Sequence, residues 1–482
     1  MYKKLLALIL LINLVQIPVF ADSIGNNINE KEYPDANSVL PNQNGESIVI
    51  EGSVEKNIEM NLERCIEIAL GNNPQINAAF QDILASDARI KQVWSNYFPQ
   101  ISWQTGYTKI KQLQLSDALG KNLTFNYYIL GQVTLQQMLY DFGVTQNQAT
   151  IKRLDYENYK QALTSTINDV IYQTKDAYYN LLFAMESKRV AEDTVHKFEM
   201  FYDQAKAFYK IGMNPKVDVT IAEANLSNSK LQLIQADNAV NLAMAKLNNV
   251  MGVPFIDKYT VQERLDYIPV DITLEKSVDI AREARPELKQ AEIKVESAKQ
   301  TLKLVKKSYF PTLSVEGQYQ RGGKSWNSNY GYNIGGYLNF PTVNGMLVRN
   351  EIKEARYLYD KELANATTTQ NAIYLEIQNA FLLLTEKKNQ IPVALLQVKQ
   401  AKENYELSYG RYRVGEASPT ELKDSQILYQ QAQLSYYNAL YQYNSAKAAL
   451  EKAIGKNIIT EEDAIELKQA DDKGSKGNVN KS

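Results

Sequence analysis

Alternation of apolar and polar residues marks one short region in each half of the chain. The alternating stretches are residues 101–108, 125–136, 313–320 and 332–340. A period of two is typical of a β-strand with one apolar and one polar face. The pattern therefore predicts two β-hairpins, at about residues 100–137 and 311–341, and four strands in all.

Most of the remaining chain carries a helical pattern. Residues 144–211 contain neither proline nor glycine, and a helix of that length would reach roughly 100 Å. The helical segments at residues 62–96 and 215–250 are each about half as long. Stacked end to end, these two arms would run beside the long helix.

A seven-residue spacing follows the return helix at residues 215–250 and recurs along the second return helix at residues 419–454. In the first copy the positions are Val219, Ala222, Leu226, Ser229, Leu233, Ala236, Val240, Ala243 and Leu247. In the second copy they are Leu422, Ser425, Tyr429, Ala432, Tyr436, Ala439, Tyr443, Ala446 and Leu450. Large residues alternating with Ala or Ser are typical of a coiled-coil seam, although an ordinary antiparallel scaffold has the same periodicity.

The two halves of the chain repeat one plan of helix, hairpin, long helix, glycine turn and return helix. The matching landmarks are Asn73-Pro74 and Arg285-Pro286, Phe98-Pro99 and Phe310-Pro311, Gly212 and Gly415, and Gly252 and Gly455. We therefore predict a first repeat at residues 58–256, a linker at 257–271 and a second repeat at 272–458. The second long helix is expected at residues 346–413.

The ends of the chain differ from the repeats. Lys3 and Lys4, an apolar run and a small residue at Ala21 predict a signal peptide at residues 1–21. The polar segments 22–57 and 459–482 are expected to be poorly ordered. Since no later stretch approaches roughly 18 consecutive apolar residues, we expect an exported protein without a helical membrane anchor.

Composition argues against several function classes. A net charge of -2 over 482 residues gives no basic face for nucleic acid. The chain has a single histidine, His196, and a single cysteine, Cys65. These residues cannot form a histidine-rich metal site or a disulfide, and no second histidine is present to activate a serine or cysteine nucleophile elsewhere. We expect no enzyme activity, metal or cofactor, and we expect His196 on the surface.

Strands of about ten residues with one apolar face match those of outer-membrane barrels, and the aromatic residues fit interfacial girdles. Soluble hairpins show the same alternation, but the export signal and the aromatic content favour the membrane. Four strands cannot close a barrel that needs about eight or more. Several chains must therefore contribute to one barrel.

With these landmarks, residues 60–455 resemble the TolC family of outer-membrane efflux proteins. Residues 137–143, QMLYDFG, resemble the family's passage from strand to helix. The Tyr-x-x-Gly turns at Gly212 and Gly415 resemble its helical tips. The resemblance implies a mainly α, α+β membrane protein, a homotrimer with one 12-stranded β-barrel and a long coiled-coil α-barrel.

The same resemblance implies a passive exit duct in the outer membrane, with its helical tunnel in the periplasm. Its partners would be membrane lipid, a periplasmic adaptor and an inner-membrane transporter, because no sequence here resembles a nucleotide-binding loop. The alternative is an exported periplasmic coiled-coil scaffold without channel activity. An adaptor is a third possibility, but no lipoyl-like domain is found. The sequence identifies neither cargo nor adaptor.

The helical tips carry the candidate site residues that the resemblance implies. Glu421 and Asp424 match the carboxylates that ring the periplasmic entrance of the family. Glu421 also fits a capping box with Ser418, with Pro419 at the first helical position, so its carboxylate has a structural explanation. Asp424 lies beyond the first turn, where capping needs no acid, and is therefore the preferred gate residue. Three copies of each carboxylate would crowd negative charge into a narrow opening.

Further tip residues follow from the same resemblance. Asp218 and Tyr412 could hydrogen-bond and hold the tips closed, although Asp218 also suits the start of its own helix. Ala417 stands where the family has a basic partner, and Arg413 is the candidate replacement. The turns at Gly212 and Gly415, with their preceding residues Ile211 and Val414, are the expected docking points for an adaptor.

Overall fold

The structure, a computed structural model, describes residues 60–113, 124–253, 259, 261, 265–323, 330–340 and 346–457. The predicted signal peptide 1–21, the segment 22–57 and the tail 459–482 lie outside the described residues. So do the tips of both hairpins and part of the linker 257–271.

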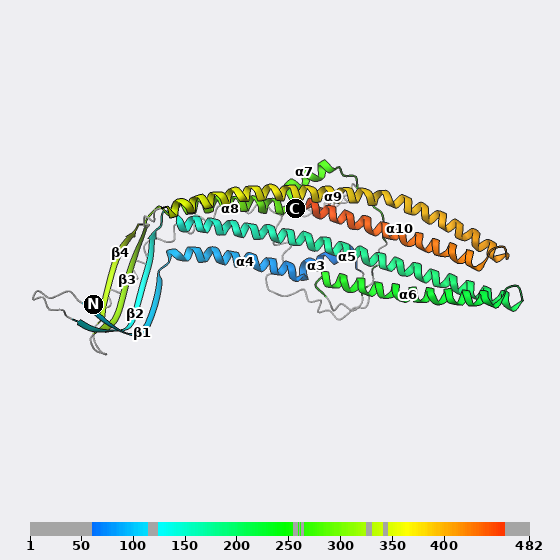
Figure 1. Cartoon of the computed structure of the whole chain (residues 1–482), viewed down its shortest axis with the longest axis horizontal. Helices are drawn as coiled ribbons and strands as arrows, with labels where there is room; N and C mark the ends of the chain where they lie inside the picture. The colour runs from blue at the N-terminus through cyan, green and yellow to red at the C-terminus, as the bar shows by residue number, and fades with distance from the viewer. Residues whose placement is uncertain are drawn as a thin grey trace, which may run out of the picture. The chain divides into compact units, whose positions relative to one another are not determined.

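The described chain is mainly helical with four antiparallel strands, as predicted. Its elements in order are α3 (Leu62–Asn72), α4 (Pro74–Trp94), the 3-10 turn η2 (Ser95–Tyr97), β1 (Gln100–Leu113), β2 (Thr124–Tyr140), α5 (Val144–Lys210), α6 (Lys216–Val250), α7 (Leu274–Ala284), α8 (Pro286–Lys307), β3 (Thr312–Gly323), β4 (Tyr330–Asn339), α9 (Leu347–Arg413) and α10 (Pro419–Ile454). None of the described helices has a stretch long and apolar enough to cross a membrane. Figure 1 shows the four strands together at one end of the long helices.

The strands form one sheet in the order β1-β2-β3-β4. The register aligns one apolar residue from every strand in a row across the sheet, namely Trp103, Val133, Tyr319 and Tyr332. The next row is polar and consists of Ser102, Thr134, Gln318 and Asn333. Because neighbouring positions of a strand point to opposite faces, the sheet has one apolar and one polar face.

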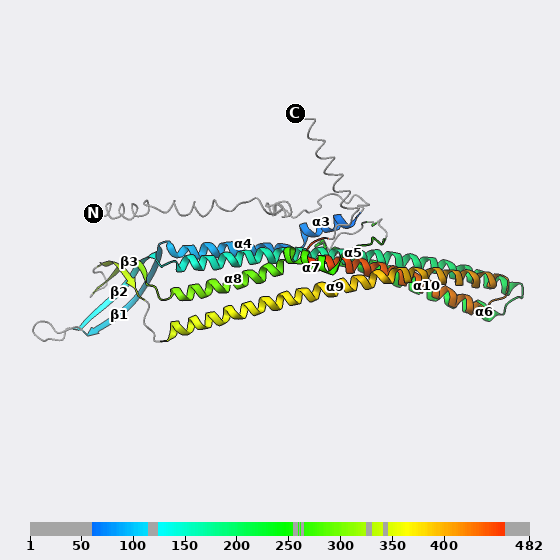
Figure 2. The same ribbon diagram turned by 90° about the horizontal axis from the view of Figure 1, so that it is seen from above.

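The helices lie in the same lateral order as the strands. α4 packs on α5, α5 on α8, and α8 on α9 (Figures 1 and 2). Beyond α4 and α8, the return helices α6 and α10 continue alongside α5 and α9. Each half therefore has one continuous helix and one column made of shorter helices.

The arm that we expected as one helix over residues 62–96 is two helices, because the chain breaks at Asn73-Pro74. Proline lacks an N–H and pushes the preceding residue out of the helical region, and Asn73 is extended with ψ 123°. The Asn73 side chain accepts from the N–H of Gln75 at 2.8 Å, which caps α4. Its Nδ2 donates to the carbonyl of Val250 at the end of α6, also at 2.8 Å.

A glycine allows this close approach in each half. A Cβ on Gly252 would lie 2.4 Å from the carbonyl oxygen of Asn72. In the second half, a Cβ on Gly455 would lie 3.2 Å from the carbonyl of Ala284. Both glycines have positive φ, which favours glycine. The end of each return helix thus lies directly against the break before α4 or α8.

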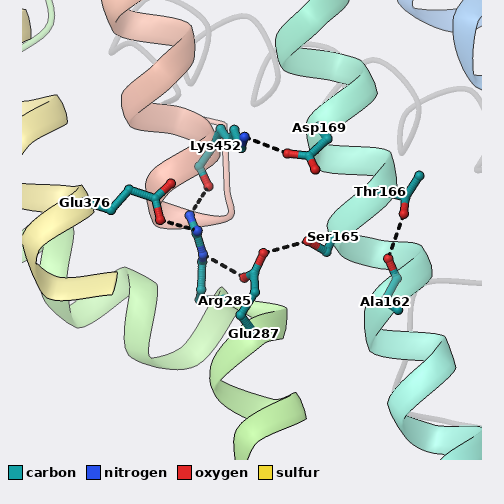
Figure 3. A network of polar contacts seen from close by, with 8 residues as sticks. All are labelled: Ala162, Ser165, Thr166, Asp169, Arg285, Glu287, Glu376 and Lys452. Carbon is teal, nitrogen blue, oxygen red and sulfur yellow. Dashed lines mark hydrogen bonds and ion pairs between the residues drawn. The ribbon is translucent and has the colours of Figure 1, made fainter. Parts of the chain in front are cut away.

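The break at Arg285-Pro286 carries a charged network (Figure 3). The break at Asn73-Pro74 has the neutral amide of Asn73 in the corresponding place. Arg285 is only 5% exposed. It donates to the carbonyl of Lys452 at 2.8 Å and forms ion pairs with Glu287 at 2.7 Å and Glu376 at 2.5 Å. Ser165 donates to Glu287 at 2.6 Å. One guanidinium and its carboxylates therefore connect α5, α8, α9 and α10.

The passage from β2 to α5 is fixed by Asp141. Its carboxylate accepts from the Tyr97 hydroxyl at 2.7 Å and from the N–H groups of Gly143 and Thr145 at 3.0 and 2.6 Å. Burial alone raises the pKa of Asp141, but hydrogen bonds from Thr145 and Tyr97 outweigh burial and hold that pKa below its usual value. The preceding strand and the following helix therefore share one buried anchor.

We predict that Gly252→Ala destabilises the fold more than Gly212→Ala. Both changes place alanine at positive φ, which costs about 1 kcal/mol. Only the first also forces a Cβ against backbone, for about 1–3 kcal/mol more, since nothing lies within 4 Å of a Cβ on Gly212. Denaturant unfolding of both variants measures the difference, and equal losses would contradict this close approach.

Candidate functional site

The two helical tips are built alike. Gly212 ends the α5 turn with φ 75°, and Gly415 ends the α9 turn with φ 82°. The next N–H, of Met213 or Glu416, donates back to the carbonyl of Phe208 or Arg411 at 2.9 Å. This arrangement is a Schellman closure, which satisfies the last carbonyls of a helix. Each long helix therefore stops sharply and reverses into its return helix.

The apex of each tip exposes apolar side chains. Ile211 and Val414 are both 68% exposed, and Met213 and Val217 are exposed beside the first turn. A Cβ on Gly212 or Gly415 would meet nothing within 4 Å, so the turns themselves are open. These features suit contact with a partner, and docking of an adaptor at Ile211, Gly212, Val414 and Gly415 stays a prediction.

The second tip contains an ion pair that sequence reasoning missed. Arg411 pairs with Glu421 at 2.5 Å, and it also donates to the carbonyl of Glu416 at 3.3 Å. Arg413, our candidate for the missing basic partner, does not form this pair, and its place in the closing network stays a prediction. Its position two residues away turns it to another side of the helix. The pair reaches from the last turn of α9 to the first turn of α10, and so closes the tip.

Glu421 combines this pair with a role in capping. The Ser418 hydroxyl accepts from the N–H of Glu421 at 3.1 Å, and Pro419 is the first helical residue of α10. The Glu421 carboxylate itself turns to Arg411. The expected N-cap is therefore present, but the carboxylate is bound to a cation rather than exposed alone.

Asp424 differs from Glu421. Its side chain is 61% exposed, and its charged neighbour is Lys423 at 3.5 Å. Both groups lie on the surface, where such a pair contributes little. Of the two predicted gate carboxylates, Asp424 is therefore the more available to solvent and to ions.

Tyr412 is buried inside the tip and only 3% exposed. Burial, and then the charge of Asp218, raise the pKa of its hydroxyl. Within the described part of the chain, no hydrogen bond joins Tyr412 to Asp218. Asp218 lies in the first turn of α6, where a carboxylate favours the helix start.

Behind the tips lies an aromatic cluster that the sequence did not reveal. Its buried members are Phe198 and Phe201 of α5, Tyr405 and Tyr412 of α9, and Leu422 of α10. Tyr405 stacks on Tyr429 of α10 with ring centroids 5.8 Å apart. Burial raises the pKa of Tyr405 to about 12, so its hydroxyl stays neutral at physiological pH. The cluster joins α9 and α10 of the second repeat to α5, the long helix of the first repeat.

Residue types with catalytic or metal-binding chemistry lie apart. His196 is exposed on α5, and Cys65 is buried in α3. In the ranges that the structure describes, no three His, Cys, Asp or Glu side chains are grouped so that they could hold a metal ion.

Long paired helices that end in open tips, joined to a sheet with one apolar and one polar face, point to the class of outer-membrane channel proteins. The sequence model of the family "Outer membrane efflux protein" matches residues 65–253 and 278–456. The chain belongs to this family. It is an efflux channel protein of the outer membrane, and its helices lie in the periplasm.

Individual relatives are distant but match over most of their length. The chain is 21% identical to the outer membrane protein TolC of Escherichia coli K12 over 435 residues, 85% of each protein. It is 19% identical to the probable efflux pump outer membrane protein TtgC of Pseudomonas putida, covering 82% of each. The crystal structure of the Campylobacter jejuni CmeC outer membrane channel has a TM-score of 0.69 at 18% identity, covering 92% of this chain and 96% of CmeC.

We predict that Leu422→Ala loosens the second tip. Leu422 is 2% exposed within the aromatic cluster, and truncating such a side chain costs about 2–5 kcal/mol. The control is Leu428→Ala, six residues along the same helix and 53% exposed, which should change stability by less than about 0.5 kcal/mol. Hydrogen exchange of the amides in residues 405–430 should accelerate in the first variant only; equal rates would contradict the role of the cluster.

Proposed function

We propose that three copies of this chain close into one ring, and that the ring is a passive duct for substrates delivered by an inner-membrane transporter through a periplasmic adaptor. Twelve strands would form the β-barrel, and twelve helical columns would form the tunnel. Each chain would contribute two structural repeats, at residues 58–256 and 272–458. The observation that carries the proposal is the shared lateral order of strands and helices.

That shared order leaves matching open edges on the two sides of the protomer. β1 and β4 are the outer strands of the sheet, and within the described chain no further strand pairs with their outer edges. An open edge invites pairing with another strand. α4 follows the β1 side and α9 the β4 side, so one rotation would bring β4 against β1 and α9 against the α4–α6 column of the next copy.

α9 carries a second apolar face opposite its buried one. The exposed residues of this stripe are Tyr357, Leu375, Leu382, Val393 and Leu407. Their spacings of 18, 7, 11 and 14 residues each correspond to whole turns of a helix. In a single chain this stripe faces solvent, and an apolar stripe of this length is typical of a protein interface.

The opposite side of the protomer has a comparable stripe on α6. Val217, Leu231 and Leu242 are exposed and follow one line at spacings of 14 and 11 residues, with Ile234 beside them. The seam residues of α6, including Ala222, Ser229 and Leu247, are buried on its other face. Two apolar stripes on opposite flanks favour a closed ring of copies over a single chain.

The dimensions and the sheet faces agree with a duct. Twelve columns spaced by about 10 Å place their axes on a ring roughly 38 Å across. The row of Trp103, Val133, Tyr319 and Tyr332 would face lipid, where aromatic and aliphatic side chains are stable. The polar row that begins at Ser102 would then face the water-filled interior.

The tips would form the periplasmic entrance. Apolar Ile211 and Val414 beside open glycine turns suit adaptor docking. Asp424 would repeat three times around the axis, and a ring of carboxylates favours cations. Glu421, neutralised by Arg411, would contribute less negative charge, while buried Tyr412 and Asp218 would help hold the tip shape.

We predict that Leu382→Lys prevents trimer formation. Lysine in the middle of the α9 stripe would bury a charge at each of the three interfaces, which is unfavourable without a partner. The control is Gln431→Lys, which adds the same charge at an exposed polar position of α10. Native mass spectrometry of the detergent-solubilised protein should show three copies for the control and not for Leu382→Lys. A trimeric Leu382→Lys variant would contradict this interface.

We also predict that Asp424→Asn increases single-channel conductance in a planar bilayer and lowers the preference for cations. The variant removes three negative charges from the entrance while keeping the side-chain shape. Glu403→Gln is the matched control, because it removes an exposed carboxylate ten residues from the α9 end. Equal conductance in wild type and Asp424→Asn would place the gate elsewhere, whereas no conductance in folded wild-type protein would refute the duct.

A further inference from the structure

The apolar face of the sheet reaches the end at which the helices begin. Leu313 lies six residues before Tyr319 on β3, so both side chains are on the same face. Leu313 pairs with Tyr140 of β2 and with Leu338 of β4, which are 54% and 52% exposed. The face that would contact lipid therefore extends to the passage from strands to helices.

Three aromatic rings, the trio Tyr140, Phe142 and Phe310, continue this face beyond the strands. The Tyr140 ring meets Phe142 edge to face with centroids 4.8 Å apart, and Phe142 stacks on Phe310 at 5.5 Å. All three side chains are exposed. Phe142 has φ 54°, a conformation that favours glycine, so its ring is held here against a backbone preference. Exposed aromatic rings gather where a membrane meets water, and we place that boundary at this trio.

Three lysines lie on the helical side of the aromatic trio. Lys306 and Lys307 follow Lys303 by three and four residues at the end of α8, so the three side chains share one side of the helix. The Lys307 ammonium donates to the carbonyl of Gly143, the residue after Phe142, at 2.6 Å. This contact brings the lysine side of α8 next to the trio. Because an ammonium has three N–H donors, Lys307 keeps two for another acceptor.

These lysines have no acidic partner in the part of the chain that the structure describes, where none of them forms an ion pair. Glu296, further back on α8, is bound by Lys299 at 3.1 Å and by Gln300 at 2.6 Å. Asp141 is buried and already accepts three hydrogen bonds. α8 packs between α5 and α9, so its lysine side lies apart from the contact proposed between copies.

The first repeat shows that the end of a helix does not by itself require this charge. A helix end favours cations, and the position matching Lys303, 212 residues earlier, is Lys91. Lys91 is paired with Asp87 at 2.6 Å. The positions matching Lys306 and Lys307 are Trp94 and Ser95. Three lysines without an acidic partner are therefore a feature of the second repeat, beside the aromatic trio.

We propose that Lys303, Lys306 and Lys307 bind the phosphate headgroup of an anionic phospholipid in the periplasmic leaflet, while the aromatic trio contacts the glycerol and upper acyl chains of that lipid. Hydrogen bonds from an ammonium to a phosphate are charge-assisted and strong. Each chain would hold one such lipid, which would fix the depth of the barrel in the membrane. This inference rests on the proposed β-barrel, because the barrel places the trio against lipid.

The test measures which lipids the purified trimer retains, by native mass spectrometry after reconstitution in nanodiscs of equal parts phosphatidylglycerol and phosphatidylcholine. Wild type should retain phosphatidylglycerol preferentially. A lysine near an anionic lipid surface contributes about 1 kcal/mol, or about fivefold in binding. The double variant Lys303→Gln/Lys306→Gln should therefore lower the retained ratio about 25-fold. Both side chains are exposed, so this variant should keep its fold.

Two further double variants are the controls. Lys289→Gln/Lys294→Gln removes the same number of charges from exposed positions of α8 further from the sheet, and it should keep the wild-type ratio. Lys303→Arg/Lys306→Arg keeps two cations that bind phosphate, and it should stay close to wild type.

The outcomes separate the lipid site from the barrel. Wild type without a preference for phosphatidylglycerol, or an unchanged ratio in Lys303→Gln/Lys306→Gln, would overturn the site. An equal loss in Lys289→Gln/Lys294→Gln would overturn it too, because total charge rather than these lysines would be responsible. Conductance of wild type in bilayers of phosphatidylcholine alone tests the barrel independently. Folded wild-type protein that neither inserts nor conducts there would refute the barrel and the duct instead.

Discussion

The contact between each return helix and the X-Pro break of its own repeat determines the rest of the architecture. At Gly252 the chain touches the backbone of Asn72 and Asn73, and at Gly455 it touches Ala284 and Arg285. A side chain at either glycine would crowd this contact. Because the contact forms, two shorter helices serve as one column as long as the uninterrupted helix beside it, and the sheet and the tips stay at opposite ends.

The two repeats use this contact with different chemistry. In the first, the neutral Asn73 binds a single carbonyl of α6. In the second, Arg285 binds a carbonyl of α10 and carboxylates from α8 and α9. The charged version therefore holds α9 near its middle. Beyond that point α9 contains Pro392, and its buried residues resume at Tyr405 and Tyr412 in the aromatic cluster of the tip.

Features encoded locally could be predicted from the sequence, whereas contacts between helices could not. Alternation around Trp103 and Tyr319 indicated strands with two different faces, and glycines 212 and 415 indicated the turns of the tips. The pairing of Arg411 with Glu421 depends on how separate helices face one another. The same holds for the Lys197 ammonium of α5, which lies over the rings of Tyr405 and Tyr429. Periodicity along one helix carries no such information. The break at Asn73-Pro74 was visible as a landmark, but its role required the position of Gly252.

The central claim is that the open edges of one protomer meet those of the next. Cryo-electron microscopy of the purified protein in lipid nanodiscs tests it most directly. The account predicts three copies around one axis, with β4 of each copy hydrogen-bonded to β1 of the next and the α9 stripe covered by the neighbouring α4–α6 column. A particle in which β1 and β4 stay unpaired, or in which the α9 stripe remains exposed to solvent, would contradict it.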